Sequence, residues 1–394
     1  MVANSAKTAR ACPALPRIPG TDYTGPMKWS MVVAGALLPP DLAAELAKAI
    51  RAPRLAQWLT GARMGRELRA DEHGCAHWTW LAHAFGMQAD PPVTAPYAFH
   101  DGEAGTPRWR DAWIAHCDPV HLAIGHDRLV LRTLAQAPLR ANEARELFAS
   151  AHQVFAGQAH APAPALHLEN QYGQWYLVST VALDLRCAPL DAVVGRSVHE
   201  YLPTGSSARA LKRLGNEVQM LWHASNVNAE RESHGTMPVN AVWIHGGGPW
   251  QALPPSHIDH VGVDPPSHEE AILRGWMLAG ATAEGGRAAQ GKGNAIVLDK
   301  HLFEFFALQA WDAWLSAMTR LEDRIEQQMA QARARGATAF ELVLCGAQHA
   351  RVFALPLTQP WWRRLQGAPR RPALVLDRLL AEPADDLGRG RSGP

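Results

Sequence analysis

The chain has 394 residues, long enough to bury a large core in one large domain or about two ordinary ones. Its formal net charge is +1, from 38 basic and 37 acidic residues, which excludes the strong positive field of proteins that bind nucleic acid or anionic membranes. The five cysteines include no C-x-x-C pair, which argues against a disulfide framework and a zinc ribbon. Because no run of about 18 apolar residues and no signal-peptide pattern is present, we expect a cytoplasmic protein without a membrane span.

The first half of the chain alternates short apolar runs with helical patterns. Residues 1–26 are rich in Ala, Pro and Thr and predict a mobile tail. An apolar strand is expected over 29–38, where two prolines stop it. Further elements are expected as helices over 41–50, 75–85 and 142–155, a loop over 86–107, a strand pair over 113–122 and 129–134, and a strand over 174–180.

The second half continues this alternation. A helix over 206–223 is expected to bury one apolar stripe, and a polar loop is expected to follow it from residue 226. Strands alternating with long helices indicate an α/β fold with a mixed central sheet flanked by helices, over one domain at 27–376, with a disordered tail at 377–394. The other expected elements are strands over 260–263 and 295–298, helices over 268–278 and 301–335, and a hairpin of 340–344 with 351–355.

Three consecutive glycines, Gly246, Gly247 and Gly248, follow an apolar strand pattern. Glycines at a strand exit let backbone N–H groups approach an anion closely, so these residues are candidate ligand contacts. The run lacks the Lys-Ser/Thr pair of a phosphate-binding P-loop. A tight turn without a ligand is the alternative interpretation.

Short amides and a guanidinium lie just before the glycines. Asn226, Asn228 and Arg231 are side chains that suit a carboxylate or phosphate oxygen, and Asn240 and His245 return to the same neighbourhood along the next strand. The sequence therefore predicts a site for a small anionic ligand. The alternative is that the asparagine side chains hydrogen-bond their own backbone.

The densest group of His and Asp residues is His257, Asp259, His260 and Asp264, with His268 close behind. Imidazole and carboxylate groups could hold zinc or manganese, so a divalent metal is a possible cofactor. Paired prolines on both sides favour the alternative, an exposed loop without metal. No cofactor is the preferred expectation.

A second carboxylate–imidazole pair, Asp118 and His121, precedes His126 and Asp127. These residues could lie beside a ligand pocket. The alternative, which we favour, is a turn that carries a hydrogen-bonded histidine before a hairpin.

Six short stretches carry a family resemblance, namely DPVHL at 118–122, NEVQM at 216–220, NVNAERE at 226–232, PVNAVWIHGGG at 238–248, LRG at 273–275 and VLD at 297–299. They resemble the bacterial RpfE-type regulatory protein family, which is often labelled cofactor-independent phosphoglycerate mutase-like. The pattern from Asn226 to Gly248 is also remotely similar to the archaeal-type phosphoglycerate mutases of the alkaline phosphatase superfamily.

The resemblance implies an alkaline phosphatase-like fold and, in active members, two divalent metals with a serine that carries the phosphoryl group. This chain departs from that pattern, because the strand at 31–38 has no carboxylate before Asp41 and the segment 340–349 offers one His and no Asp. We therefore expect a degenerate, non-catalytic or weakly catalytic regulatory protein that binds a small anionic ligand or a protein partner, and neither nucleic acid nor membrane. The alternative is an active metal-dependent phosphotransferase or phosphohydrolase.

Overall fold

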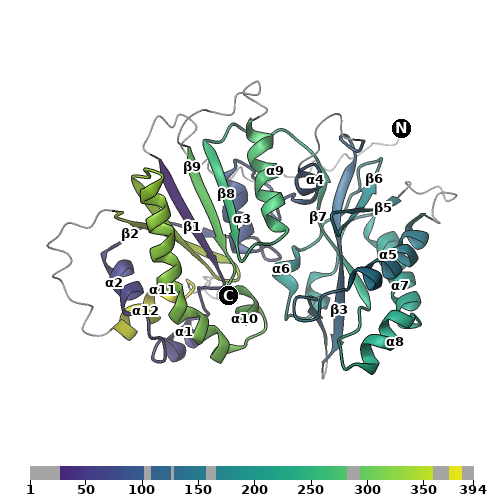
Figure 1. Cartoon of the computed structure of the whole chain (residues 1–394), viewed down its shortest axis with the longest axis horizontal. Coiled ribbons are helices and arrows are strands. Elements are labelled where there is room, and N and C mark those ends of the chain that lie inside the picture. Colours follow the sequence, from purple (N-terminus) through teal and green to yellow (C-terminus); the bar gives the residue numbers. More distant parts are fainter. Residues whose placement is uncertain are drawn as a thin grey trace, which may run out of the picture.

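The computed structural model describes residues 27–101, 108–125, 128–156, 166–281, 293–357 and 372–383. Two lobes, each built on one sheet, lie side by side (Figure 1), and the predicted mixed α/β class is confirmed. The predicted tail over 1–26 lies outside the described residues. The helix α12 (Pro372–Leu380) passes position 377, where the sequence predicted the C-terminal tail to begin, and residues 384–394 lie outside the described part. The boundaries of one domain over 27–376 stay a prediction.

The first lobe is organised by a six-stranded mixed sheet. Strand β1 lies at its centre and runs parallel to both neighbours, β10 and β9, while β11 and β2 extend one edge antiparallel. The strand order is β2 (Arg63–Arg69), β11 (His349–Leu355), β10 (Ala339–Cys345), β1 (Lys28–Ala34), β9 (Asn294–Asp299) and β8 (Ile258–Asp264).

Both faces of this sheet are buried, as helices on both sides of a parallel sheet require. Alternate residues of β1 face opposite ways: Trp29 and Met31 join the outer core, and Val32 and Ala34 join the core between the lobes. Helices cover the outer face, namely α1 (Pro40–Leu46), α2 (Pro53–Gly61), α10 (Phe303–Ala307), α11 (Trp311–Ala334) and α12.

The second lobe is organised by an antiparallel sheet around the long strand β3. One edge of β3 pairs with β6 and then with β4, and its other edge pairs with β7 along most of its length. The strands are β3 (Trp113–Ile124), β4 (Leu129–Arg132), β5 (Leu166–Gln171), β6 (Gln174–Ser179) and β7 (Ala241–Pro249), and the outer face carries α5 (Ala141–Ala156), α7 (Ala208–His223) and α8 (Asn226–Ser233).

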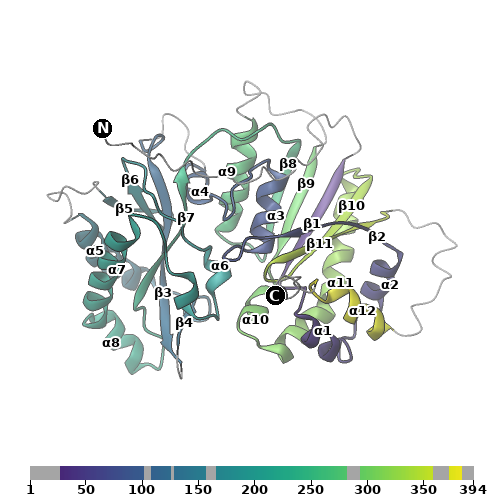
Figure 2. The ribbon, with the colours of Figure 1, turned by 180° about the vertical axis from the view of Figure 1, so that it is seen from behind.

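A middle layer of helices fills the space between the sheets (Figure 2). The core there includes Val32 from the first sheet and Ile114 and Val178 from the second, so the lobes share one hydrophobic core. The layer contains α3 (Ala76–Ala84), α4 (Ala95–Phe99), α6 (Leu190–Val193), the 3-10 turn η2 (Val198–Tyr201) and α9 (Glu269–Ala281). No helix within the described ranges is long and apolar enough to cross a membrane.

Several local predictions were wrong. The predicted loop over 86–107 contains helix α4, and the single helix predicted over 301–335 is divided into α10 and α11. The predicted polar loop after residue 226 is helix α8, because the side chain of Ser225 accepts the N–H of Asn228 and caps the first turn. The predicted glycine turn is instead part of strand β7, which continues through Gly246, Gly247 and Gly248 to Pro249.

A close helix crossing in the middle layer generates a stability prediction. An added Cβ at Gly275 of α9 would lie 2.3 Å from the carbonyl oxygen of Tyr97 on α4. We expect Gly275→Ala to lower the free energy of unfolding by about 1–3 kcal/mol, because the two backbones must separate. Chemical denaturation measures this change.

The matched control is Gly215→Ala on α7, where an added Cβ has nothing within 4 Å. That substitution should stabilise the chain by about 0.5–1 kcal/mol, since alanine has the higher helix propensity. Equal effects of the two substitutions would contradict the close crossing of α4 and α9.

Candidate functional site

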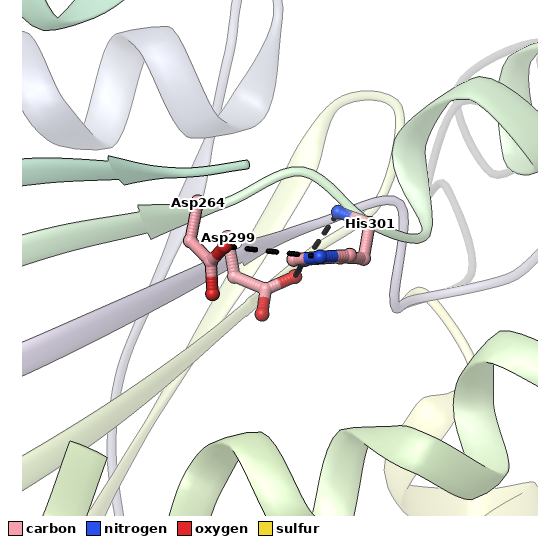
Figure 3. Close-up of side chains that lie close together, drawn as sticks. All are labelled: Asp264, Asp299 and His301. Carbon is pink, nitrogen blue, oxygen red and sulfur yellow. Dashed lines mark hydrogen bonds and ion pairs between the residues drawn. The ribbon is translucent and has the colours of Figure 1, made fainter. Parts of the chain in front are cut away.

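Two carboxylates and an imidazole meet at the carboxyl edge of the first sheet (Figure 3). Asp264 ends β8 and Asp299 ends β9, and the parallel register pairs them directly. His301 follows two residues later, with its Nδ1 3.5 Å from Asp299 Oδ1 and its Nε2 3.8 Å from Asp264 Oδ1. We call these three residues the sheet-edge cluster. The carboxyl edge of parallel strands is where ligands commonly bind in α/β proteins.

The hydrogen bonds around the sheet-edge cluster leave polar atoms unused. Asp299 is fully buried; its Oδ2 accepts from Nε of Arg324 at 2.7 Å and its Oδ1 accepts the backbone N–H of His301 at 3.1 Å. Nδ1 of His301 and Nη2 of Arg324 are buried with no hydrogen-bond partner. Unpaired buried polar atoms are costly, so they indicate a missing ligand or water. Imidazole with two carboxylates suits zinc or manganese and leaves coordination positions open.

A small pocket, with a cavity volume of about 40 Å³, lies on the other side of the sheet, between the lobes. Strands β3 and β7 supply one wall, and α3, α6 and the start of α9 supply the other. We call it the inter-lobe pocket. Its polar lining residues are Thr94, His116, Asp118, Asp191, His245, His268 and Glu269.

Asp118 and His245 form a carboxylate–imidazole pair in this pocket. Nε2 of His245 lies 2.8 Å from Oδ2 of Asp118, on adjacent strands. Burial raises the pKa of Asp118, but the hydrogen bond from His245 and the nearby imidazoles outweigh burial and lower that pKa to about 2. Asp118 is therefore a stable anion, and the hydrogen bond places the imidazole proton on Nε2.

His116 stacks on His245, with ring centroids 4.9 Å apart and an interplanar angle of 25°. It is 1% exposed, and its Nε2 is buried without a hydrogen-bond partner. Burial lowers its pKa well below the usual value, and repulsion from a charged His245 acts in the same direction. His116 is therefore a neutral imidazole in the wall of the pocket.

Lys300 joins the first sheet to the middle layer of helices beside this pocket. Its Nζ lies 2.8 Å from Oδ2 of Asp191 on α6 and also contacts Glu269 on α9. The same Asp191 oxygen accepts from His77 and Trp78, each at 2.9 Å. Burial alone would lower the pKa of Lys300, but the two carboxylates outweigh burial and raise it. Burial alone would raise the pKa of Asp191, but Lys300 and His77 outweigh burial and lower it. The network is therefore ionised.

The residues predicted to hold an anionic ligand are mostly engaged elsewhere. Asn228 donates to the carbonyls of Trp222 and Val239 and accepts the N–H of Val239, and Asn240 exchanges two hydrogen bonds with the backbone of Leu122. These bonds favour the alternative interpretation, in which asparagines satisfy the backbone.

Arg231 is likewise 3% exposed and donates to Glu143, Ala137 and Met237. Asn226 is exposed at the first position of α8. Ligand binding by Asn226, Asn228, Arg231 or Asn240 stays a prediction, and for all but Asn226 it would require internal bonds to break.

The glycines are required by close packing. Added Cβ atoms would lie 2.0 Å from Thr94 Oγ1 at Gly246, 2.3 Å from the Trp113 ring at Gly247 and 2.7 Å from Val93 at Gly248. Gly246 also has a φ of +61°, which disfavours a side chain. Of the predicted ligand contacts, His245 and Gly246 do line the inter-lobe pocket, and Gly247 lines a neighbouring one with a cavity volume of about 290 Å³.

The four residues predicted to hold a metal lie along β8 or just before it. Of these, only Asp264 belongs to the sheet-edge cluster. Asp259 accepts the N–H of Gly293, and the ring of His260 packs against Trp29 with centroids 5.6 Å apart. His257 precedes the strand. His268 lines the inter-lobe pocket.

Sequence reasoning missed Asp299, His301, Lys300, His116 and Asp191. The available signal was an Asp at the end of an apolar strand with a His two residues later, at 299–301. His121 is hydrogen-bonded to the carbonyl of Pro238, as the favoured alternative predicted, while His126 and Asp127 lie outside the described residues.

Comparison with known proteins finds no matching family model. Over 81 residues the chain is 31% identical to the 2,3-bisphosphoglycerate-independent phosphoglycerate mutase of Methanothrix thermoacetophila. These 81 residues are 21% of this chain and 21% of that protein. The chain thus matches about a fifth of the length of this curated relative. It has remote similarity to a phosphoglycerate mutase, and the resemblance to the RpfE-type family stays a prediction.

Two solved structures align along most of the chain. The cofactor-independent phosphoglycerate mutase of Thermoplasma acidophilum has 12% identity and a TM-score of 0.33, over 90% of this chain and 100% of that one. The PH0037 protein of Pyrococcus horikoshii has 11% identity and a TM-score of 0.42, over 89% and 92%. Because both TM-scores lie below 0.5, neither likeness supports a conclusion about fold or activity.

The engagement of Arg231 generates a prediction. We expect Arg231→Ala to lower the free energy of unfolding by about 3–5 kcal/mol, because it leaves the buried carboxylate of Glu143 without its partner. Denaturant titration measures the loss, and Arg209→Ala, at an exposed position on α7, should change stability by less than about 0.5 kcal/mol. If Arg231→Ala leaves stability unchanged, the structural role of Arg231 is contradicted and ligand binding becomes the better explanation of this residue.

The Asp118–His245 pair predicts a pH-dependent contribution to stability. Since the folded pKa of Asp118 is about 2 against 3.8 for the free side chain, its charge stabilises the fold by about 2 kcal/mol above pH 4, and this contribution fades as pH falls toward 2. Asp118→Asn should therefore cost about 2 kcal/mol at pH 7 and roughly half as much at pH 3. Urea unfolding at both pH values measures this, and a cost independent of pH would contradict the ion pair.

Proposed function

We propose that this protein is a regulatory or ligand-binding protein on a phosphoglycerate mutase-like scaffold, which binds one divalent cation at the sheet-edge cluster and, through it, a small anionic ligand. Asp264, Asp299 and His301 would hold the cation. The observation that carries the proposal is the buried, unpartnered Nδ1 of His301 beside two carboxylates.

Arg324 supports the anionic part of the proposal. Its guanidinium already contacts Asp299 through Nε, and its buried Nη2 has no partner. A guanidinium N–H beside a cation suits a carboxylate or phosphate oxygen. When bound, the cation would supply positive charge and open coordination positions for such an oxygen.

The neighbouring strand end supports a non-catalytic or weakly catalytic role. Strand β1 lies directly beside β9 and ends at Ala34, followed by Gly35. A Cβ added at Gly35 would lie 2.9 Å from Phe306 Cβ, so a larger side chain does not fit there. Without a carboxylate at this end, a second cation lacks a ligand, and two-metal phosphoryl transfer lacks one of its two metals.

The second candidate is an active metal-dependent phosphotransferase or phosphohydrolase. The sheet-edge cluster itself favours it, because a three-ligand site with open positions is the arrangement of catalytic rather than structural metals. Metal-dependent hydrolysis of p-nitrophenyl phosphate by the purified chain, lost in Asp264→Asn, would favour this candidate over the first.

The cation site is tested by metal analysis. After equilibration with Mn²⁺ or Zn²⁺ and dialysis, we expect about one ion per wild-type chain and a roughly tenfold or greater loss of affinity in Asp264→Asn, since one of three protein ligands is weakened. The matched control is Asp259→Asn, in the same strand but outside the cluster, which should keep its metal. No bound metal in the wild type, or loss in the control instead, would contradict the proposal.

A further inference from the structure

The inter-lobe pocket combines groups that the cation site does not use. It lies on the opposite side of the first sheet from the outer core, and its wall includes His245, which is hydrogen-bonded to a carboxylate, and the buried neutral histidine His116. We propose that His245 is the hydrogen-bond acceptor for a hydroxyl group, of water or of a small neutral hydroxylated ligand, held in the inter-lobe pocket, and that Asp118 orients it. This goes beyond the proposed function and does not depend on the cation.

The orientation of His245 comes from Asp118. Because the carboxylate accepts the Nε2 proton at 2.8 Å, the neutral ring has its lone pair on Nδ1. Among the described residues, none hydrogen-bonds Nδ1. A carboxylate that holds one imidazole nitrogen while the other is unprotonated is the arrangement of a general base.

The bound hydroxyl donates its hydrogen bond to Nδ1 of His245, and no covalent bond breaks. The Nε2 proton stays with His245 and is held by the anionic Asp118. The hydroxyl oxygen is thereby polarised without a metal.

His116 supports this orientation from the adjacent face. It is stacked on His245 and stays neutral, so it places no positive charge beside that ring. An added Cβ at Gly246 would lie 3.1 Å from its Cδ2, so the two rings and the glycine backbone are closely packed in this wall of the pocket.

The surrounding charges favour a neutral ligand. Three carboxylates line the pocket, namely Asp118, Asp191 and Glu269, and the single Lys300 pairs with two of them. Besides these carboxylates, His116 and His245, the wall contains one further titratable side chain, His268. Tyr176 of β6 packs against His116, and burial raises the pKa of its hydroxyl group. The surplus of negative charge disfavours an anion here, and an alcohol or water carries no such penalty.

Two measurements on the full chain test the proposal after metal removal with a chelator. Long-range ¹H–¹⁵N spectra of ¹⁵N-histidine-labelled protein at pH 8, assigned with His245→Gln, should show the proton of His245 on Nε2. A proton on Nδ1 would overturn the proposal. The second measurement is labelling with diethyl pyrocarbonate, which reacts with unprotonated imidazole nitrogen, followed by mass spectrometry of the peptide that contains His245.

We expect wild-type His245 to be labelled, and Asp118→Asn to lower the labelling rate by about tenfold or more, since the other tautomer becomes accessible. The control is Asp41→Asn, an exposed carboxylate on the outer helix α1, which should label as the wild type does. An unlabelled wild-type His245 would show that its Nδ1 is closed to ligands, and equal labelling in Asp118→Asn would show that Asp118 does not orient it. Either result overturns the proposal, and the wild-type results stand alone should Asp118→Asn not fold.

Discussion

The buried ionic contact between Lys300 and Asp191 is the constraint on which the arrangement of both sites depends. Lys300 follows β9 of the first lobe and Asp191 lies on α6 of the middle layer, and their 2.8 Å contact lies in the shared interior. A buried charge that loses its partner costs several kcal/mol, so the first sheet and the middle layer cannot separate here without a large penalty. The shared hydrophobic core supplies the bulk of the contact, and this ion pair fixes its position.

Lys300 also lies between the two candidate sites, the sheet-edge cluster and the inter-lobe pocket. It stands between Asp299 and His301 in the chain, directly after the end of β9, and its side chain contacts other elements than theirs. The sheet-edge cluster therefore lies on the face covered by α11, while Lys300 points to the inter-lobe pocket. The first site offers carboxylates, an imidazole and a guanidinium for a cation and an anion. The second offers an oriented imidazole for a neutral hydroxyl group.

Regular elements could be predicted from the sequence because their patterns are local. The stripe Trp314, Met318 and Leu321 is buried in α11, and the strand pair β10 and β11 forms the expected hairpin. Strand β2 was missed because it is an exposed, charged edge strand without an apolar alternation.

The sites depended on contacts between distant residues, and these could not be predicted from local patterns. Asp264 and Asp299 meet only through the parallel register of β8 and β9, and Arg231 finds Glu143 far earlier in the chain. The Asn and Arg residues at 226–231 looked like ligand groups because their internal partners are not visible in the sequence. The sequence correctly indicated that the backbone at 246–248 requires glycine. The reason is close packing against Thr94 and Trp113 rather than a turn.

The central claim is that the cation site and the inter-lobe pocket are separate, with one ion at the sheet edge and none beside His245. Anomalous diffraction at the manganese edge, from crystals grown with Mn²⁺, tests this most directly. The account predicts one anomalous peak, bounded by Asp264, Asp299 and His301. A peak bounded by Asp118 and His245, or no peak at the sheet edge, would contradict it.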